Sequence, residues 1–575
     1  MIKLIPSVKK LVLTGGTLSV RGFWHCFRGD ERVQKALCAL PHDPHGTKIE
    51  LFVGEGSGEE YSLSVEADLV KICAEGPAGA FYAVQTLRQL ANAPSIPLLE
   101  ISDKPDFSYR GFYHDVTRGK VPTVKTVKEL IDRMAYFKMN ALQLYVEHTF
   151  DFREYASVTK QTGCFTREEI LEIGAYCKEN FISFEPSLST FGHLYELHEQ
   201  PQYHQLRVLK HYEKHPHFWH QRMAHHTIDP KHPESIKLIR SLIDQYEPLF
   251  ESEYFNVCSD ETFDLKSYEK GGEDVGKLYA DFVGQIVSHV NQKGKKAMMW
   301  ADILQEHPET IHTLPEDTCF LNWEYSANAP EEKVASFARL GRRQIVCPGT
   351  STWSRFCENI HCSEENISKM AEYGFRHGAV GVLNTNWGDY GNPCSLELSL
   401  YGLVLGAEKS WAATSEIGED FHGRVNALLY RSENGFDCAL ELSRIHNLVS
   451  WNRFCTNFFR LRYLKEETLK DCLFCEIGQV QHDCLALRET LEADEKLLPA
   501  IKEEMLLTLE ALLVMAEANA KLFGHSFERV TDTHEWLNRY RKAWLDKNKP
   551  SELSAIEKVF CEYETAAKEG FPTNR

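Results

Sequence analysis

Short apolar runs alternate with helical patterns between residues 110 and 390. The helical stretches include VPTVKTVKELIDRMAYFKM (121–139) and GKLYADFVGQIVSHVNQKG (276–294). Strand–helix alternation predicts a parallel sheet, and eight repeats predict a (β/α)8 TIM barrel, expected over residues 105–400. The eight runs are RGFYHDVTRG (110–119), ALQLYVEH (141–148), ISFEPSLS (182–189), YFNVCSDE (254–261), KAMMWADI (296–303), TCFLNWEY (318–325), RQIVCPGT (343–350) and GVLNTNWG (381–388).

Different patterns flank this region. Residues 1–100 predict a small α+β domain, with strands in YSLSVEADLVKICA (61–74) and a helix in GAFYAVQTLRQLANA (79–93). Residues 401–575 predict an α-helical domain, since apolar residues there recur at i, i+3 and i+4 with charged residues between them. This apolar stripe is a packing surface against the barrel, the domain itself or a second subunit, so a homodimer is an open expectation.

Composition narrows the class of protein. A hydrophobic content of 43% and a charged content of 26% are ordinary for a soluble globular chain. The net charge of −19 argues against nucleic acid and anionic membranes as partners. The start of the chain is too polar for a signal peptide, and the 17 cysteines show no regular spacing, so we expect free thiols in the cytoplasm.

Residues suited to chemistry follow the predicted strands. In FNVCSDETFDL (255–265), two adjacent carboxylates, Asp260 and Glu261, end a strand. A surface turn would explain that pair alone, but not similar residues at so many strand ends, which meet at one face of a barrel. Tryptophan rings pack on sugar C–H faces, and carboxylates bind sugar hydroxyls, so we expect a carbohydrate pocket. The other strand-end groups are Glu147 with His148, Trp300 with Asp302, Trp323 with Tyr325, Trp353, and Trp387 with Asp389.

The adjacency of the two carboxylates restricts the mechanism. Glycosidases ordinarily place two carboxylates about 5–10 Å apart across the scissile bond, which neighbouring residues cannot do easily. Asp260 and Glu261 can serve a 2-acetamido sugar, whose own carbonyl oxygen attacks the anomeric carbon to form an oxazolinium ion. One carboxylate then orients the amide, and the other protonates the leaving oxygen and later activates water. The acid role leads us to expect a raised pKa at Glu261.

Over roughly residues 1–400 the chain resembles the family 20 glycoside hydrolases, the β-N-acetylhexosaminidases. Their signature is a strand that ends in Asp-Glu, which NVCSDE (256–261) matches. The resemblance implies that Asp260 positions the acetamido group and that Glu261 is the general acid/base. It also implies that Arg110 grips hydroxyls of the terminal sugar. His193, in FGH, and an acid placed like Glu147 are expected to form a relay to Glu261.

The tryptophans complete the resemblance. Trp300, Trp323 and Trp387 are expected to line the acetamido pocket, and Asp389 to bind outer hydroxyls. The chain departs from the family at Cys258, where a glycine is usual, and in STWSRF (351–356), where the tyrosine that bonds the oxazolinium is absent. Tyr325 and Tyr390 are the two candidate substitutes.

These observations predict an exo-acting, retaining hydrolase that removes terminal β-linked N-acetylhexosamine, GlcNAc or alternatively GalNAc, from glycans without a cofactor or metal. One alternative is a non-catalytic glycan-binding protein on the same barrel. Another is a metal-dependent hydrolase that uses the histidines of HYEKHPHFWHQRMAHH (211–226). That stretch lacks a recognisable ligand spacing such as His-Glu-x-x-His, so we expect an insertion covering the barrel mouth.

Overall fold

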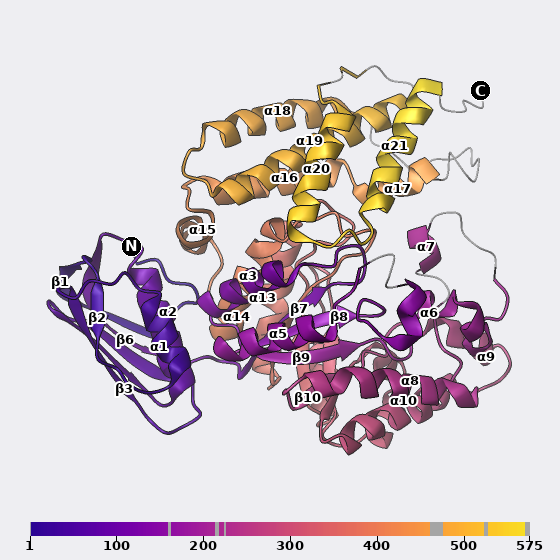
Figure 1. Ribbon diagram of the computed structural model, residues 1–575, viewed down its shortest axis with the longest axis horizontal. Coiled ribbons are helices and arrows are strands. Elements are labelled where there is room, and N and C mark those ends of the chain that lie inside the picture. Colours follow the sequence, from indigo (N-terminus) through magenta and orange to yellow (C-terminus); the bar gives the residue numbers. More distant parts are fainter. Residues whose placement is uncertain are drawn as a thin grey trace.

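The computed structural model describes residues 2–158, 163–212, 218–222, 226–459, 475–522, 527–528 and 530–569. It has three parts: a small domain built on a mixed sheet, a closed barrel, and a helical region that lies beyond one side of the barrel (Figure 1). The predicted fold class is therefore confirmed. Within the described part of the chain, no helix combines the length and the apolarity needed to cross a bilayer.

The N-terminal domain is a six-stranded mixed sheet in the order β1-β6-β4-β5-β3-β2. Helix α2 is buried along most of its length, because it packs between this sheet and the barrel. The elements are β1 (Lys10–Ser19), β2 (Phe23–His25), α1 (Glu31–Cys38), β3 (Thr47–Val53), β4 (Tyr61–Val65), β5 (Leu69–Ala74), α2 (Pro77–Leu90) and β6 (Ser95–Asp103).

Eight parallel strands close the barrel, and the last strand pairs with the first in a register from Gly381↔Tyr109 to Asn386↔His114. In three of these strands every residue is buried, and in the other five all but one, which explains their continuous apolar runs. The strands are β7 (Tyr109–Asp115), β8 (Ala141–Val146), β9 (Ser183–Leu188), β10 (Tyr254–Asn256), β11 (Lys296–Trp300), β12 (Cys319–Trp323), β13 (Gln344–Cys347) and β14 (Gly381–Asn386).

Amphipathic helices cover the outside of the barrel. Most of them begin at a residue whose side chain caps the helix; at α5, for example, Thr166 and Glu169 form a reciprocal capping box. The covering helices are α3 (Val124–Tyr136), α5 (Arg167–Glu179), α8 (Pro233–Tyr246), α10 (Val275–Gln292), α12 (Glu331–Arg339), α13 (Ile360–Arg376) and α14 (Leu400–Trp411). Short helices in the loops at the strand ends are α6 (Tyr195–His198), α7 (Phe218–Arg222), α9 (Lys266–Glu269) and α11 (Asp302–Glu306).

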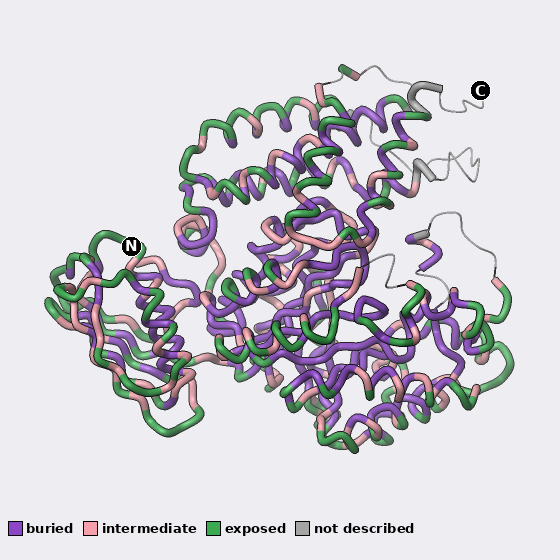
Figure 2. The backbone as a smooth tube through the Cα atoms, in the orientation of Figure 1, coloured by how far each residue is buried: buried purple, intermediate pink, exposed green. Residues whose placement is uncertain are grey.

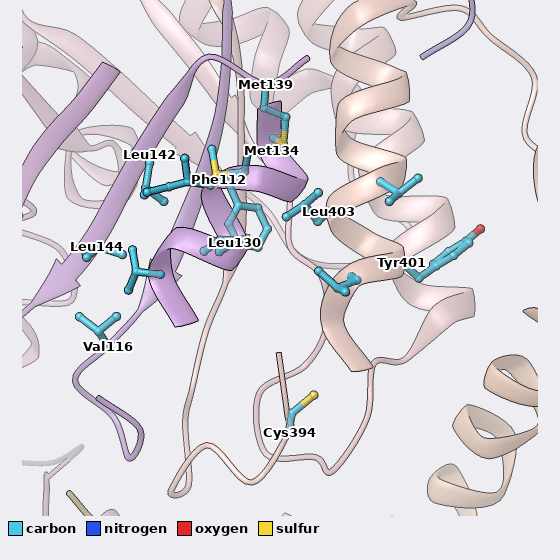
Figure 3. Packing of buried hydrophobic residues seen from close by; sticks show 14 of the residues in the cluster. Phe112, Val116, Leu130, Met134, Met139, Leu142, Leu144, Cys394, Tyr401 and Leu403 are labelled. Atoms are coloured by element: carbon cyan, nitrogen blue, oxygen red, sulfur yellow. The ribbon is translucent and has the colours of Figure 1, made fainter. Parts of the chain in front are cut away.

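Apolar packing joins the strands to these helices. Phe112 of β7 lies among Leu130 and Met134 of α3 and Leu403 of α14, all fully buried (Figure 3). The buried backbone is concentrated in the barrel and in the helical faces turned toward it (Figure 2). Inside the barrel, Tyr113 and Tyr145 belong to a second buried cluster that reaches the strand ends. The site is thus built on a rigid, fully packed base.

The C-terminal helices pack against one another and against the barrel mouth (Figure 1). Glu552, just before α21, bonds Trp219 and Arg222 of the long connection between β9 and β10. The described residues of the stretch 211–226, which was predicted to cover the barrel mouth, therefore lie beside that mouth. These helices are α15 (Glu419–Val425), α16 (Gly435–Leu448), α17 (Trp451–Phe459), α18 (Cys475–Ala493), α19 (Pro499–Leu522), α20 (Thr533–Lys547) and α21 (Leu553–Glu569).

Candidate active site

A tight turn after β10 carries the adjacent carboxylates. Cys258, Ser259 and Glu261 all have left-handed backbone, with φ of 53°, 69° and 48°. This conformation is unfavourable for residues other than glycine and is tolerated where the surroundings enforce it. Cys258 thus adopts a backbone suited to the family's glycine. Asp260 is buried, whereas the side chain of Glu261 remains 27% exposed and reaches the mouth.

His193 lies between the two carboxylates. Its Nε2 is 3.3 Å from Asp260 Oδ2 and 3.3 Å from Glu261 Oε2. Burial disfavours an imidazolium here, but the charge of Asp260 and the hydrogen bonds to Asp260 and Glu261 together outweigh that effect and raise the pKa of His193 to about 10. Burial would raise the pKa of Glu261, but His193 beside it leaves that pKa below its usual value. The expectation of a raised pKa at Glu261 is therefore wrong for the unliganded protein.

A third carboxylate joins this cluster. Asp302, two residues after strand β11, accepts a hydrogen bond from the backbone N–H of Glu261 at 3.0 Å. Burial and the nearby charge of Asp260 raise the pKa of Asp302 to about 7. At neutral pH it is thus the carboxyl of the cluster that holds a proton most readily.

Arg118 connects the other polar groups. Its Nη1 lies 2.7 Å from Asp389 Oδ1, its Nη2 3.3 Å from His193 Nδ1, and its Nε 3.5 Å from Glu147 Oε1. The guanidinium also packs on Tyr145, 5.1 Å from the ring centroid. This places Arg118 at the wall of the mouth, with Asp389 20% exposed beside it.

Arg110 lies at the opposite end of strand β7. Its side chain is fully buried, and Nη1 and Nη2 bond Glu59 of the N-terminal domain at 2.7 and 2.9 Å. Successive residues of a strand face opposite sides, so Arg110 points outward while Tyr113 and Asp115 point into the barrel. The prediction that Arg110 grips substrate is therefore wrong, and Arg118 is the arginine that lies in the cluster.

The predicted relay is also rearranged. Glu147 accepts a hydrogen bond from Tyr145 at 2.9 Å, and Arg118 lies between it and His193. Burial would raise the pKa of Glu147, but the charges of Arg118, His193 and Arg222 together lower it. Glu147 thus anchors Arg118 as an ionised carboxylate, and its link to His193 runs through the guanidinium.

The four tryptophans of the prediction come together in two connected groups. Trp300 and Trp387 are buried, with ring centroids 5.7 Å apart. Trp323 and Trp353 are half-buried and flank Tyr325, at 5.1 and 5.2 Å from its ring. Trp387 Nε1 donates to the Tyr325 hydroxyl at 2.8 Å and so joins the groups.

Of the two candidate tyrosines, Tyr325 belongs to this aromatic wall. Asp260 is among the charges that help burial to raise its pKa, which places the hydroxyl near the carboxylate cluster. Tyr390 instead hydrogen-bonds His220, at 2.9 Å from Nδ1. Tyr325 is therefore the better placed of the two to meet a ligand held by Asp260.

The histidine-rich stretch supports the site from outside. His226 Nδ1 accepts the backbone N–H of His193 at 2.9 Å, and the two rings stack at 4.7 Å. His215, His217 and His225 lie outside the described residues. In the described part of the chain, the donor atoms close enough to hold a metal ion belong to His193, Asp260 and Glu261. The candidate metal donors are thus the histidine and the two carboxylates of the site itself.

Arg118, Tyr145 and His226 are the site residues that the sequence analysis missed. Arg118 lies inside the first predicted run, RGFYHDVTRG (110–119), three residues after the observed strand ends at Asp115. Tyr145 falls in a continuous apolar run that hides its inward orientation, and nothing near His226 in the sequence marks it as a neighbour of His193.

The structure is a closed parallel barrel whose carboxyl end carries clustered carboxylates, an arginine and an aromatic wall. These features define the class of (β/α)8 proteins that bind ligands at that face. Two family models match this chain. The catalytic-domain model of glycosyl hydrolase family 20 matches residues 107–373, and the model of domain 2 of that family matches residues 34–104. The chain belongs to glycoside hydrolase family 20.

Similar proteins agree with this assignment. A β-hexosaminidase of Porphyromonas gingivalis is 26% identical over 46% of this chain and 39% of its own length. One from Vibrio furnissii is 23% identical over 57% of this chain and 58% of its own length. The chain thus matches less than two-thirds of the length of these curated relatives.

Solved structures share the fold. The chitobiase of Flavobacterium johnsoniae superposes with a TM-score of 0.61 at 17% identity, covering 97% of this chain and 99% of its own. A family 20 exo-β-N-acetylglucosaminidase of Vibrio harveyi, in complex with N-acetylglucosamine, gives 0.59 at 18% identity, over 74% and 76% of the two chains. At such identities the likeness concerns the fold alone.

Proposed function

We propose that the protein is an exo-acting, retaining β-N-acetylhexosaminidase that removes terminal GlcNAc, or GalNAc, by substrate-assisted catalysis. The observation that carries this proposal is the turn that presents Asp260 and Glu261 together on His193, beside an aromatic wall. Family membership and the names of the relatives, several of them β-hexosaminidases, support the same activity.

In this mechanism the acetamido oxygen of the substrate attacks its own anomeric carbon. Asp260 accepts the amide N–H and stabilises the positive charge that develops on the oxazolinium ring. The Tyr325 hydroxyl, held by Trp387, donates to the amide oxygen. Glu261 enters the cycle as the carboxylic acid, and because His193 lowers its pKa, this form is populated on the acidic side of neutrality. It protonates the leaving oxygen, and then, as a carboxylate, takes a proton from the water that opens the ring. Glu261 ends the cycle in its starting protonation state.

Arg118 and Asp389 bind the sugar from the other side. The pair lies at the wall of the mouth and offers both donors and acceptors to ring hydroxyls. Glu147, Tyr145 and Asp115 fix the position of Arg118, because each touches its guanidinium or the turn that carries it. A hydroxyl that bonds to this pair is held by charge-assisted hydrogen bonds.

A chromogenic β-N-acetylglucosaminide tests the proposal directly. We expect release of the chromophore that is unaffected by a chelator. Activity lost with chelator and restored by a divalent cation would instead favour a metal-dependent hydrolase, for which the grouping of His193, Asp260 and Glu261 is the supporting observation. Binding of the sugar without turnover would favour a glycan-binding protein.

The pH dependence of kcat/KM should fall on both sides of an optimum below neutrality. As pH rises through about 7, Asp302 loses its proton. The carboxyl cluster of Asp260, Glu261 and Asp302 then holds one proton fewer, so a smaller fraction of the enzyme can protonate the leaving group. In acid, protonation of the carboxylates removes the negative charge that the oxazolinium needs. Asp302→Asn should move the alkaline limb away from pH 7, while the exposed control Asp281→Asn should not; a profile flat from about pH 4 to 9 would contradict this assignment.

Substitution of Arg118, just after strand β7, and of Arg110, within it, should have different effects. The first should lower catalytic efficiency, and the second should lower stability. Arg118→Met is expected to lower kcat/KM by about 100-fold or more, because charge-assisted bonds to the sugar are lost. Arg110→Met should leave kcat/KM of the folded enzyme unchanged but lower the melting temperature. The reason is that the Glu59 carboxylate, at the junction between the N-terminal domain and the barrel, loses the arginine with which it forms an ion pair.

The measurements are steady-state kinetics and thermal melting on the same preparations. Adding Glu59→Gln to Arg110→Met should recover part of the lost melting temperature. Should Arg110→Met raise KM while Arg118→Met does not, the assignment of the two arginines is reversed.

A further inference from the structure

A pocket of about 700 Å³ opens beside Glu261 and Trp323. Its lining includes Phe263 and Ile303, which follow β10 and β11, Trp323 at the end of β12, and Lys333 of α12. Trp323 stacks on Tyr325, with ring centroids 5.1 Å apart, and the Lys333 ammonium lies 4.7 Å from the Trp323 ring centroid. Trp323 therefore belongs both to the aromatic wall of the site and to the lining of this pocket.

The position of the pocket determines which part of a substrate can enter it. A general acid must lie beside the oxygen that it protonates, so the leaving group extends from Glu261. Glu261 and Asp302 both line the pocket. A glycan whose terminal sugar lies against Trp387 would direct its next residue here.

Phe263 gives this pocket an aromatic surface. Its ring is 45% exposed, which is unusual for phenylalanine, and its backbone N–H bonds the Glu261 carbonyl at 2.7 Å. This bond fixes the backbone of Phe263 two residues from the acid, and the ring packs edge to face with His226, with centroids 6.1 Å apart. Exposed aromatic rings in such places pack on the apolar faces of sugars.

The charges of the lining favour a neutral occupant. Two exposed acids, Glu269 and Glu306, line the pocket beside Glu261 and Asp302, which the proposed mechanism uses in their protonated forms. Of the two ammonium groups in the lining, that of Lys333 pairs with Glu324 at 3.3 Å, which leaves Lys266 to offset both carboxylates. A leaving group that carries a carboxylate or sulfate would meet an excess of negative charge.

We propose that this pocket is the leaving-group site and that it selects a neutral sugar, stacked on Phe263, over an acidic one. The inference rests on the proposed β-N-acetylhexosaminidase activity. It predicts that the enzyme acts on neutral oligosaccharides rather than on glycans in which N-acetylhexosamine alternates with uronic acid.

Three substrates test this inference: GlcNAc β-fluoride, whose leaving atom does not reach the pocket; GlcNAcβ1-4GlcNAc; and the acidic GlcNAcβ1-4GlcA. The wild-type enzyme should show a kcat/KM at least about tenfold higher for the neutral than for the acidic disaccharide. Phe263→Ala should lower the ratio of kcat/KM for the neutral disaccharide to that for the fluoride by about 3- to 10-fold, the range of one stacking contact. Phe52→Ala, which removes a ring of similar exposure (54%) from strand β3, should leave the ratio unchanged.

Charge reversal supplies the second test. Glu306→Lys should raise kcat/KM for the acidic disaccharide relative to the neutral one. An unchanged disaccharide-to-fluoride ratio in Phe263→Ala, or equal turnover of both disaccharides by the wild type, would overturn the pocket assignment while the activity stands. Failure to hydrolyse the fluoride and both disaccharides would instead overturn the proposed function.

Discussion

Glu261→Gln is expected to lower kcat by about 10²–10⁴-fold, the usual contribution of a general acid. The amide keeps the shape of the side chain but carries no proton that it can transfer. The loss should be largest for substrates whose leaving group is a sugar or alkoxide. It should be smallest for a dinitrophenyl glycoside, whose leaving group departs without protonation. Steady-state kinetics across leaving groups of graded acidity would measure this dependence.

Glu273→Gln is the matched control, because Glu273 is an exposed residue near the end of the same loop, where it pairs with Lys231. It should leave kcat unchanged. If Glu261→Gln slowed every leaving group equally, Glu261 would have a structural role in the turn and not that of a proton donor.

Asp260→Asn is expected to be nearly as damaging, with kcat lower by about 10²–10³-fold, as when one preorganised electrostatic partner is removed. The carboxylate orients the substrate amide and faces the positive charge of the oxazolinium. The neutral amide can still hydrogen-bond but cannot stabilise that charge. Unlike Glu261→Gln, this variant should lose activity equally on good and poor leaving groups, because its effect precedes proton transfer.

Asp281→Asn, an exposed change on helix α10, controls for the substitution itself. The substrate offers an independent control: a glucoside with a plain hydroxyl at carbon two has no amide to attack, so wild-type turnover of it should be negligible. Turnover of the glucoside at the rate of the N-acetylated sugar, or full activity in Asp260→Asn, would exclude substrate assistance.

Much of this architecture was predictable because the physical signals are local. Strands buried on both faces require continuous apolar runs, and each of the eight runs overlaps an observed strand. The strand ends of a barrel converge, so Asp260, Trp300 and Trp387 could be placed at one site from order alone. Their convergence needed no distance information.

The errors came from distances that a sequence does not contain. The run 110–119 includes two arginines, and no glycine or proline marks the strand end at Asp115, so the wrong arginine was chosen. The pKa of Glu261 was expected to rise, but its sign depends on His193, which is 68 positions away in the chain and 3.3 Å away in space. The same holds for Arg118, which lies between Glu147 and His193.

The ion pair of Arg118 with Asp389 joins positions 271 residues apart, across the seam where β14 meets β7. Nothing short of a complete ring of strands brings these two side chains together. Recovery of sugar binding during refolding should therefore coincide with the last event of barrel assembly, not with formation of secondary structure. Retained activity would in turn report that the seam is intact in any circularly permuted or fragmented form of this chain.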